Sequence, residues 1–390
     1  MCRVSIVVPI YHGKKYIPFL IRQAEECRKY ADEDTKIELL LVNDAPDDLL
    51  DMQYRSESVE IIVLNTDVNR GIHGARVRGV RHCTGEYVLL LDQDDRIMPQ
   101  YVHSQLSKIG MADAVVCRCI HENKPYYNED YPFERMMCKD YMLEEGCPVI
   151  SPGQVLIRKN AVPKIWMENI MQSNCADDFL LWLSMTGEGR EFALNQDILF
   201  EHVVSYNNTS WNSLRMMESE AEMVRILKNC HAFSEEDVIR LDRMLYKIKK
   251  KHLSNLDKFR KMFYILNDWT TLREKGNRIT GYLKRQGYQC IAVYGVGYLG
   301  RHLLLEIEGN EDDVRVRYLI DRNARWIQTK YNVYTLEDKL EKTDAIIVTL
   351  VQGEEKVVEE LEDKTGAVVY TIRNLVNIIG EENCIWSKYL

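Results

Sequence analysis

The sequence predicts an α/β protein with two mainly parallel sheets and a helical region between them. Three observations in the 390-residue chain lead to this fold class. Apolar, strand-like runs alternate with helix-spaced segments over the first third. A long charged stretch with almost no glycine follows, and the alternation then starts again near residue 287. Such alternation is typical of βαβ units, in which helices cover both faces of a parallel sheet.

The length of the chain exceeds one ordinary hydrophobic core, so several domains are expected. The predicted divisions are an α/β domain over 1–212, a helical linker or bundle over 213–286, and a smaller Rossmann-like α/β domain over 287–390. In the first domain the strand-like runs lie at 4–10, 37–42, 59–64, 87–91 and 112–117, and helix-spaced segments lie at 15–30 and 72–83.

Composition excludes several classes of protein. A formal charge of −9 argues against a nucleic-acid partner, which normally requires a basic face. The N-terminus enters a strand pattern at Val4 without a charged leader, so a cytoplasmic location is expected. The eleven cysteines include no C-x-x-C pair, so neither a zinc site nor a disulfide framework is predicted. The basic run Ile248–His252 could contact the inner face of an anionic membrane, but a solvated helix face is the favoured interpretation.

Three carboxylates follow the apolar run Leu89–Leu91 within four positions: Asp92, Asp94 and Asp95. Like charges packed this closely raise one another's pKa or bind a cation. Carboxylate oxygens suit Mg²⁺ or Mn²⁺ rather than zinc, and such an ion can also bind phosphate oxygens. An N-cap with extra acid in the first helical turn explains one aspartate but not three.

A second acid, Asp44, also follows a strand-like run. Ligands of parallel sheets gather at the carboxyl ends of the strands. We therefore expect Asp44 and Asp92 to lie on the same side of the sheet, although 47 residues separate them in the sequence.

The third region carries a glycine-rich turn. Gly295, Gly297 and Gly300 follow the strand-like run 291–294, and Asp321 ends the next one. This is the context that a dinucleotide-binding fingerprint requires. The same glycines also allow close packing of a helix on a strand without any ligand, so both interpretations stay open.

Several linked strings in the first domain resemble family 2 glycosyltransferases of the GT-A fold, over about residues 3–210. They are Val4–Tyr11, Leu41–Pro46, Asn69–Gly71, Ala75–Arg76, Gly79, Gly85–Tyr87 and the cluster at Asp92. Both their order and their spacing agree with the family. The resemblance implies an inverting, metal-dependent enzyme that moves a sugar from a nucleotide-sugar donor, expected to be a UDP-sugar, to a hydroxyl of a surface glycan or a lipid-linked acceptor.

The resemblance also implies roles on the donor side. Pro9 and Tyr11 form one wall of the nucleotide pocket, and Asp44 accepts a hydrogen bond from the base. Arg70 and Arg76 lie near the donor phosphates or the base. Three positions depart from the family pattern: Asn43 replaces the usual first acid, Val77 replaces the usual Asn, and Asp177 replaces the usual Glu.

For the reaction centre the resemblance assigns Asp92 to ribose or metal, and Asp94 and Asp95 to a metal bridging the diphosphate. His202 is a further candidate metal ligand, although a lone histidine is often structural. The resemblance also implies that Asp178 is the base, because it matches the second acid of the pair that the family has at the start of an apolar helix. Helix N-terminal acid is the alternative explanation for this pair.

The remaining features indicate less. Ser151–Gln154 takes the place of an acceptor-side loop, and Trp182 and Trp211 could stack on sugars or pack in the core.

Two rival functions remain. Nucleotidyl transfer to a sugar phosphate normally uses a glycine- and lysine-bearing loop, of which Tyr11–Lys15 is a poor version. The other rival is a non-catalytic nucleotide-binding or assembly protein. An oxidoreductase is discounted because no Tyr-x-x-x-Lys pair accompanies the glycine turn.

Overall fold

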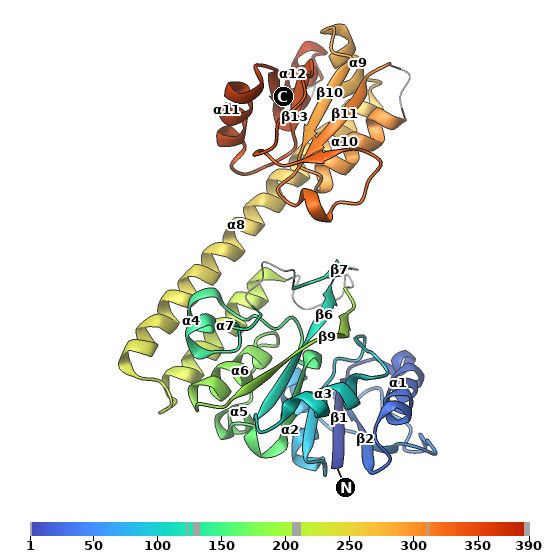
Figure 1. Ribbon diagram of the computed structural model, residues 1–390, viewed down its shortest axis with the longest axis vertical. Helices are drawn as coiled ribbons and strands as arrows, with labels where there is room; N and C mark the ends of the chain where they lie inside the picture. Colours follow the sequence, from blue (N-terminus) through green and yellow to red (C-terminus); the bar gives the residue numbers. More distant parts are fainter. Residues whose placement is uncertain (1, 122–123, 128–132, 205–211, 310–311, 386–390) are drawn as a thin grey trace. The chain divides into compact units, whose positions relative to one another are not determined.

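The computed structural model describes residues 2–385 except for 122–123, 128–132, 205–211 and 310–311 (Figure 1). The chain divides into two compact units, Met1–His252 and Leu253–Leu390, each with its own sheet. The expected fold class is confirmed: a mixed α/β unit in which parallel pairing dominates, and a second, smaller parallel sheet. The division falls within the long helix α8 (Glu235–Glu274), and the boundaries expected at 212 and 286 stay predictions.

The sheet of the first unit has the strand order β3-β2-β1-β4-β8-β6-β9-β5, with β7 paired to β6. Its strands are β1 (Cys2–Ile10), β2 (Thr35–Asn43), β3 (Glu60–Leu64), β4 (Tyr87–Leu90), β5 (Arg96–Ile97), β6 (Ala114–His121), β7 (Lys124–Pro125), β8 (Val155–Arg158) and β9 (Phe192–His202). The long ladders β1–β2, β2–β3, β1–β4 and β6–β9 are parallel, whereas β8 runs antiparallel between β4 and β6.

The helices of this unit are α1 (Ile17–Tyr30), α2 (Gly71–His82), α3 (Tyr101–Ile109), α4 (Lys139–Glu145), α5 (Lys164–Glu168), α6 (Asp177–Gly187), α7 (Ser213–Lys228) and the start of α8. Short 3-10 turns lie at η1 (Lys14–Tyr16), η2 (Pro152–Gln154) and η3 (Lys159–Ala161). Strand β1 is buried without interruption from Val4 to Ile10, as expected for a parallel strand covered on both faces. Gly79 lets α2 approach the sheet, because a Cβ there would lie 2.2 Å from Val7 Cγ1.

One polar cluster lies inside this core. Glu38 of β2 is fully buried, and its carboxylate accepts hydrogen bonds from Ser5 Oγ (2.6 Å), Thr84 Oγ1 (2.6 Å) and Arg3 Nη1 (3.1 Å). Because several donors, one of them charged, compensate the burial, the cluster can tie β1, β2 and the loop before β4 together.

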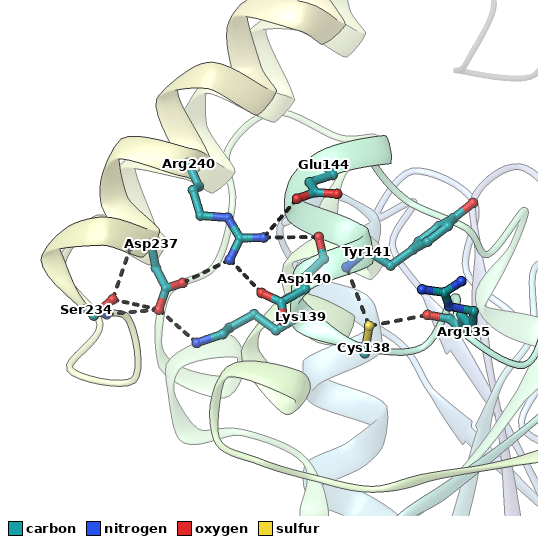
Figure 2. A network of polar contacts seen from close by, with 9 residues as sticks. All are labelled: Arg135, Cys138, Lys139, Asp140, Tyr141, Glu144, Ser234, Asp237 and Arg240. Atoms are coloured by element: carbon teal, nitrogen blue, oxygen red, sulfur yellow. Dashed lines mark hydrogen bonds and ion pairs between the residues drawn. The ribbon is translucent and has the colours of Figure 1, made fainter.

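Helix α8 begins with a reciprocal cap and is held against α4 (Figure 2). Ser234 Oγ accepts from the Asp237 N–H (3.1 Å), and Asp237 accepts from the Ser234 N–H (3.1 Å), which is the capping-box arrangement. Asp237 also pairs with Lys139 (2.8 Å), and Arg240 pairs with Asp140 (2.5 Å). These contacts fix the first turns of α8 within the first unit.

The second unit contains a five-stranded parallel sheet of order β12-β11-β10-β13-β14. Its elements are α9 (Ile279–Arg285), β10 (Cys290–Tyr294), α10 (Tyr298–Glu308), β11 (Arg315–Ile320), η5 (Ala324–Trp326), β12 (Val333–Tyr334), β13 (Ala345–Val348), α11 (Glu354–Thr365), β14 (Val368–Thr371) and α12 (Ile372–Glu382). The first strand in sequence, β10, lies in the middle, so the chain builds outward in both directions and leaves a switch point between β10 and β13. Within the described ranges, no helix combines the length and apolarity needed to cross a bilayer.

Candidate active site

The carboxyl ends of β1, β2 and β4 meet at one edge of the first sheet, because these strands are adjacent and parallel. The loops after them are hydrogen-bonded together. The Tyr11 N–H donates to Gln93 Oε1 (3.1 Å), and the Asp44 N–H donates to Ile10 O (2.8 Å). The structure therefore brings Tyr11, Asp44 and the cluster at Asp92 to one edge, as their positions after strands predicted.

At this edge, Asp44 directly follows β2, is buried, and holds the start of α2. Its Oδ1 accepts from the Arg70 N–H (2.8 Å), while the Arg70 side chain is exposed. Burial raises the pKa of Asp44, although the N–H groups of Arg70 and Gly71 oppose the shift. Pro9 is buried within β1, and Tyr11 is 54% exposed beside it. A polar wall with one exposed aromatic ring thus borders this edge.

Arg76 of α2 is the centre of the site. Its guanidinium is buried, with Nη1 donating to Asp177 Oδ2 at 2.7 Å and Nη2 donating to Asp92 Oδ1. Burial would lower the pKa of Arg76, but the carboxylates of Asp177 and Asp92 outweigh it and raise the pKa. Since two carboxylates occupy its Nη groups, Arg76 is placed to join the acidic loop to α6. Its predicted contact with phosphate or base stays a prediction.

Asp95 is also committed to internal contacts. Its side chain is fully buried and accepts from Ser151 Oγ (2.7 Å), from the Val203 N–H (3.0 Å) and, at 3.0 Å, from His202 Nδ1. Burial opposes protonation of His202, but the hydrogen bond to Asp95 and the charges around it raise the His202 pKa. Asp95 therefore ties the end of β9 and the loop before β8 to the acidic cluster.

Asp94 differs from its two neighbours. Within the part of the chain that the structure describes, its partly exposed carboxylate has no ion pair or hydrogen-bond donor from another residue. Burial, followed by the charges of Asp95 and Asp92, raises the pKa of Asp94 to about 6. An unneutralised carboxylate with this shift suits a cation.

The acidic cluster offers few protein ligands to a divalent ion. No group of three or more His, Cys, Asp or Glu side chains in the described ranges is arranged to hold a metal. Mg²⁺, however, is normally held by one or two carboxylates, with substrate phosphates and water completing its shell. Asp94, with Asp92 beside it in sequence, fits that mode of binding. It does not fit a cage made by protein ligands alone.

Asp178 lies in the first turn of α6, next to the buried Asp177. Its side chain is partly exposed, and its Oδ1 accepts from the Phe179 N–H at 2.7 Å. Burial and the neighbouring Asp177 raise the pKa of Asp178 to about 7, against the opposing charge of Arg76. The indole of Trp166 fixes this turn by donating to Asp177 O at 2.8 Å. A carboxylate with this pKa can take up a proton near neutral pH.

Several residues of the site carried no signal of their own in the sequence. Gln93 joins the loops after β1 and β4, and Asn174 Oδ1 accepts from the Ile72 N–H at 3.2 Å, which joins α2 to the loop before α6. Ser151 was expected only from its place in an acceptor-side loop, and its contact is with Asp95. Trp182 is fully buried, so the sugar-stacking interpretation is wrong for it; Trp211 lies outside the described residues.

In the second unit the three glycines of the turn differ in what they do. Gly295 has φ +91, and a Cβ on Gly300 would lie 2.0 Å from Gly295 O, so both positions require glycine for the backbone. A Cβ on Gly297 would meet no atom of the described residues within 4 Å, so this position is open. Asp321 Oδ2 accepts from the Val296 N–H (2.9 Å), so this acid shapes the turn itself.

Comparison with known proteins agrees with this architecture. The first unit is an α/β domain of the class that keeps polar groups at the carboxyl ends of parallel strands. Residues 5–166 match the model of the family described as glycosyl transferase family 2.

Among curated proteins, the chain is similar to undecaprenyl-phosphate 4-deoxy-4-formamido-L-arabinose transferases. It is 28% identical over 127 residues to that of Sodalis glossinidius, covering 31% of this chain and 38% of the relative. It is 31% identical over 118 residues to that of Pseudomonas fluorescens, covering 29% and 34%. The match thus spans little more than a third of these relatives. The crystal structure of S. aureus TarS 1–349 with UDP-GlcNAc shares 16% identity and a TM-score of 0.47 over 65% of this chain and 73% of that one.

Proposed function

We propose that this chain is an inverting, metal-dependent glycosyltransferase that moves a sugar from a UDP-sugar to a hydroxyl of a surface glycan or lipid-linked acceptor. The observation that carries the proposal is the bridge through Arg76. It holds the loop of the unneutralised Asp94 against the helix that presents Asp178. The family match over 5–166 supports the reaction, and the names of the two curated relatives, which include undecaprenyl phosphate, support a lipid-linked acceptor.

The donor nucleotide would lie along the ends of β1 and β2. Asp44 is a buried acceptor and suits the N3–H of uracil, because a buried acceptor left unpaired discriminates against bases that lack this donor. Pro9 and Tyr11 would form the wall of this pocket. The exposed guanidinium of Arg70 is available for the donor phosphates.

Asp94 and Asp92 would hold the divalent ion together with the diphosphate oxygens. Bound there, Mg²⁺ or Mn²⁺ stabilises the charge that develops on the departing nucleoside diphosphate. The predicted ligands Asp95 and His202 contact each other, so we assign them to positioning the loop that carries Asp94.

Asp178 would act as the base. Its carboxylate takes the proton from the acceptor hydroxyl as that oxygen attacks C1 of the sugar from the face opposite the diphosphate. The C1–O bond to the diphosphate breaks in the same displacement, so the configuration at C1 inverts. Arg76 is a positioning residue in this scheme, because it touches Asp177 and Asp92 and keeps the base and the acidic loop in register.

Transfer assays with a panel of UDP-sugars and Mn²⁺ test the proposal. Wild type should transfer sugar from at least one of these donors. The transfer rate of Asp94→Ala should be at least about 100-fold lower, and the exposed control Asp67→Ala should match wild type. Unchanged transfer by Asp94→Ala, or wild-type transfer that persists in EDTA, contradicts metal use at this cluster. Release of pyrophosphate from a nucleoside triphosphate would instead support the nucleotidyltransferase alternative.

We also propose peripheral contact with the inner face of a membrane through the basic run at Lys249–Lys251, whose side chains are exposed. Each lysine near an anionic surface contributes about 1 kcal/mol of attraction. Co-sedimentation with phosphatidylglycerol vesicles should be lost when the three lysines are changed to glutamine, whereas phosphatidylcholine vesicles should bind neither protein.

A nucleotide or dinucleotide is proposed at the glycine turn of the second unit. The supporting observation is Gly297, whose open surroundings leave room for a pyrophosphate next to the start of α10. Calorimetry on the full chain with NAD(H), NADP(H) and UDP-sugars tests this. A binding heat that remains in the first-unit variant Asp44→Ala but disappears in Gly297→Val supports the proposal. The absence of a binding heat with this pattern contradicts it.

A further inference from the structure

Arg118 of β6 is a charged side chain without a counterion. It is partly buried, its Nε is buried and has no hydrogen-bond partner, and its guanidinium lies 5.4 Å from the centre of the Phe133 ring. Across the described ranges, no carboxylate pairs with it. Shielding a cation from water without an anion is unfavourable, and a ring face compensates only part of the cost. The unpaired charge therefore indicates a missing anionic partner.

Strand register places Arg118 beside the reaction centre. Val88 of β4 and Ala114 of β6 both pair with Ile157 of β8, so the two residues lie at the same level and point to the same face. Asp92 and Arg118 each follow four positions later. Arg118 is still within β6, whereas Asp92 lies two residues beyond the end of β4, in the loop that Arg76 reaches. Strand β8 lies between β4 and β6, so these two strands are two spacings, roughly 10 Å, apart across the sheet.

The surroundings of Arg118 belong to the acceptor side. Phe133 contacts Tyr127, with ring centres 5.0 Å apart, and Tyr127 OH donates to Pro148 O at 2.8 Å. Phe133 and Pro148 lie on either side of α4 in the sequence, and α4 packs against α6, whose first turn carries Asp178. Arg118 is thus linked by packing to the helix of the proposed base, whereas the donor wall lies across the sheet at β1 and β2.

We propose that Arg118 forms a subsite for a phosphate group of the acceptor. The proposal rests on the proposed function and deepens it: the acceptor presents its hydroxyl to Asp178 and a phosphate to Arg118. A guanidinium matches phosphate through two parallel N–H···O bonds and stays charged when desolvated, which lysine does less well.

Binding rather than turnover tests the subsite. The probes are farnesyl phosphate, its neutral counterpart farnesol, and UDP, each titrated calorimetrically into the full chain. Wild type should prefer farnesyl phosphate to farnesol. Arg118→Gln should weaken farnesyl phosphate at least about tenfold, Arg118→Lys should keep part of the affinity, and UDP affinity should stay within twofold. The exposed control Arg55→Gln should match wild type with every probe.

Three results would overturn the subsite: no preference of wild type for farnesyl phosphate, equal binding by Arg118→Gln, or a loss confined to UDP, which would assign Arg118 to the donor diphosphate. Thermal unfolding adds a readout. Removing an uncompensated charge should leave Tm equal or higher, so a lower Tm with unchanged binding assigns Arg118 a structural role. Arg118-dependent binding without sugar transfer from any UDP-sugar would leave the subsite standing and reject the proposed function.

Discussion

Arg76 and Asp177 lie 101 residues apart in the sequence, yet they form an ion pair of 2.7 Å between two helices, and both side chains are almost completely buried. The pair joins α2, which follows β3, to α6, which precedes β9. Because Arg76 also reaches Asp92, the acidic loop after β4 is fixed to the same point. The geometry of the proposed site therefore depends on one guanidinium.

Replacing this guanidinium should destabilise the first unit. Arg76→Met leaves the buried carboxylate of Asp177 without its partner, and we expect the free energy of unfolding in urea to fall by about 3–5 kcal/mol. Arg70→Met, at an exposed side chain of the same region, should change it by less than about 0.5 kcal/mol. The double variant Arg76→Met/Asp177→Leu should recover much of the loss. A single variant as stable as wild type would show that the pair contributes little.

The pH dependence of transfer should report Asp178. Since the base must be deprotonated, kcat/KM should rise with pH and reach half its limit near the Asp178 pKa of about 7. Asp178→Asn should reduce kcat by about 10²–10⁴-fold and remove this limb from the residual rate. Asp47→Asn, at an exposed site, is the matched control. A wild-type profile that stays flat between pH 5.5 and 8.5 would argue against Asp178 as base.

The Glu38 cluster should contribute stability that depends on pH. Burial alone would raise the pKa of Glu38, but hydrogen bonds from Ser5, Thr84 and Arg3 outweigh it and lower the pKa below its ordinary value. A carboxyl whose pKa is lower in the folded state stabilises the fold at pH values above its unfolded pKa of about 4.3. This stabilisation is lost as the pH falls through the folded-state pKa.

Glu38→Gln should therefore cost about 2–3 kcal/mol at pH 7, and the difference from wild type should shrink as unfolding is measured toward pH 3. Glu60→Gln is the matched control, because Glu60 accepts from the same Arg3 at 3.0 Å but is 57% exposed. A difference that stays constant with pH would mean that the charge of Glu38 is not what matters.

In the second unit, Gly300→Ala should destabilise more than Gly297→Ala. The new Cβ at 300 would meet Gly295 O at 2.0 Å, whereas the surroundings at 297 are open. We expect a loss of about 1–3 kcal/mol for the first and a few tenths for the second, measured by thermal unfolding of the full chain. Equal effects would show that the turn relaxes around Gly300.

The sequence by itself determined the parallel core of each sheet. The runs that became β1, β2, β4, β10 and β13 are mostly apolar because strands covered on both faces bury nearly every side chain, and Ser5 and Glu38 are among the buried polar exceptions. For the same reason Asp44 and Asp92 could be placed at strand ends and on one edge. Asp94 was named as part of the acidic run after a strand, whereas Asp178 was named only through the resemblance to family 2 glycosyltransferases.

The tertiary structure decided which charges are paired and which are left over. Strand β8 is only four residues long and runs antiparallel to its neighbours, and the apolar pattern of β9 is interrupted, so the sequence did not predict either strand. Arg76, Asp95 and His202 all have sequence signals typical of ligands. In the folded chain, however, Arg76 pairs with Asp177 and Asp92, and His202 contacts Asp95. Arg118 carried no sequence signal and became notable because it packs on Phe133 without a carboxylate partner among the residues that the structure describes. Pairing of charges depends on distance in space, and distance in the chain does not encode it.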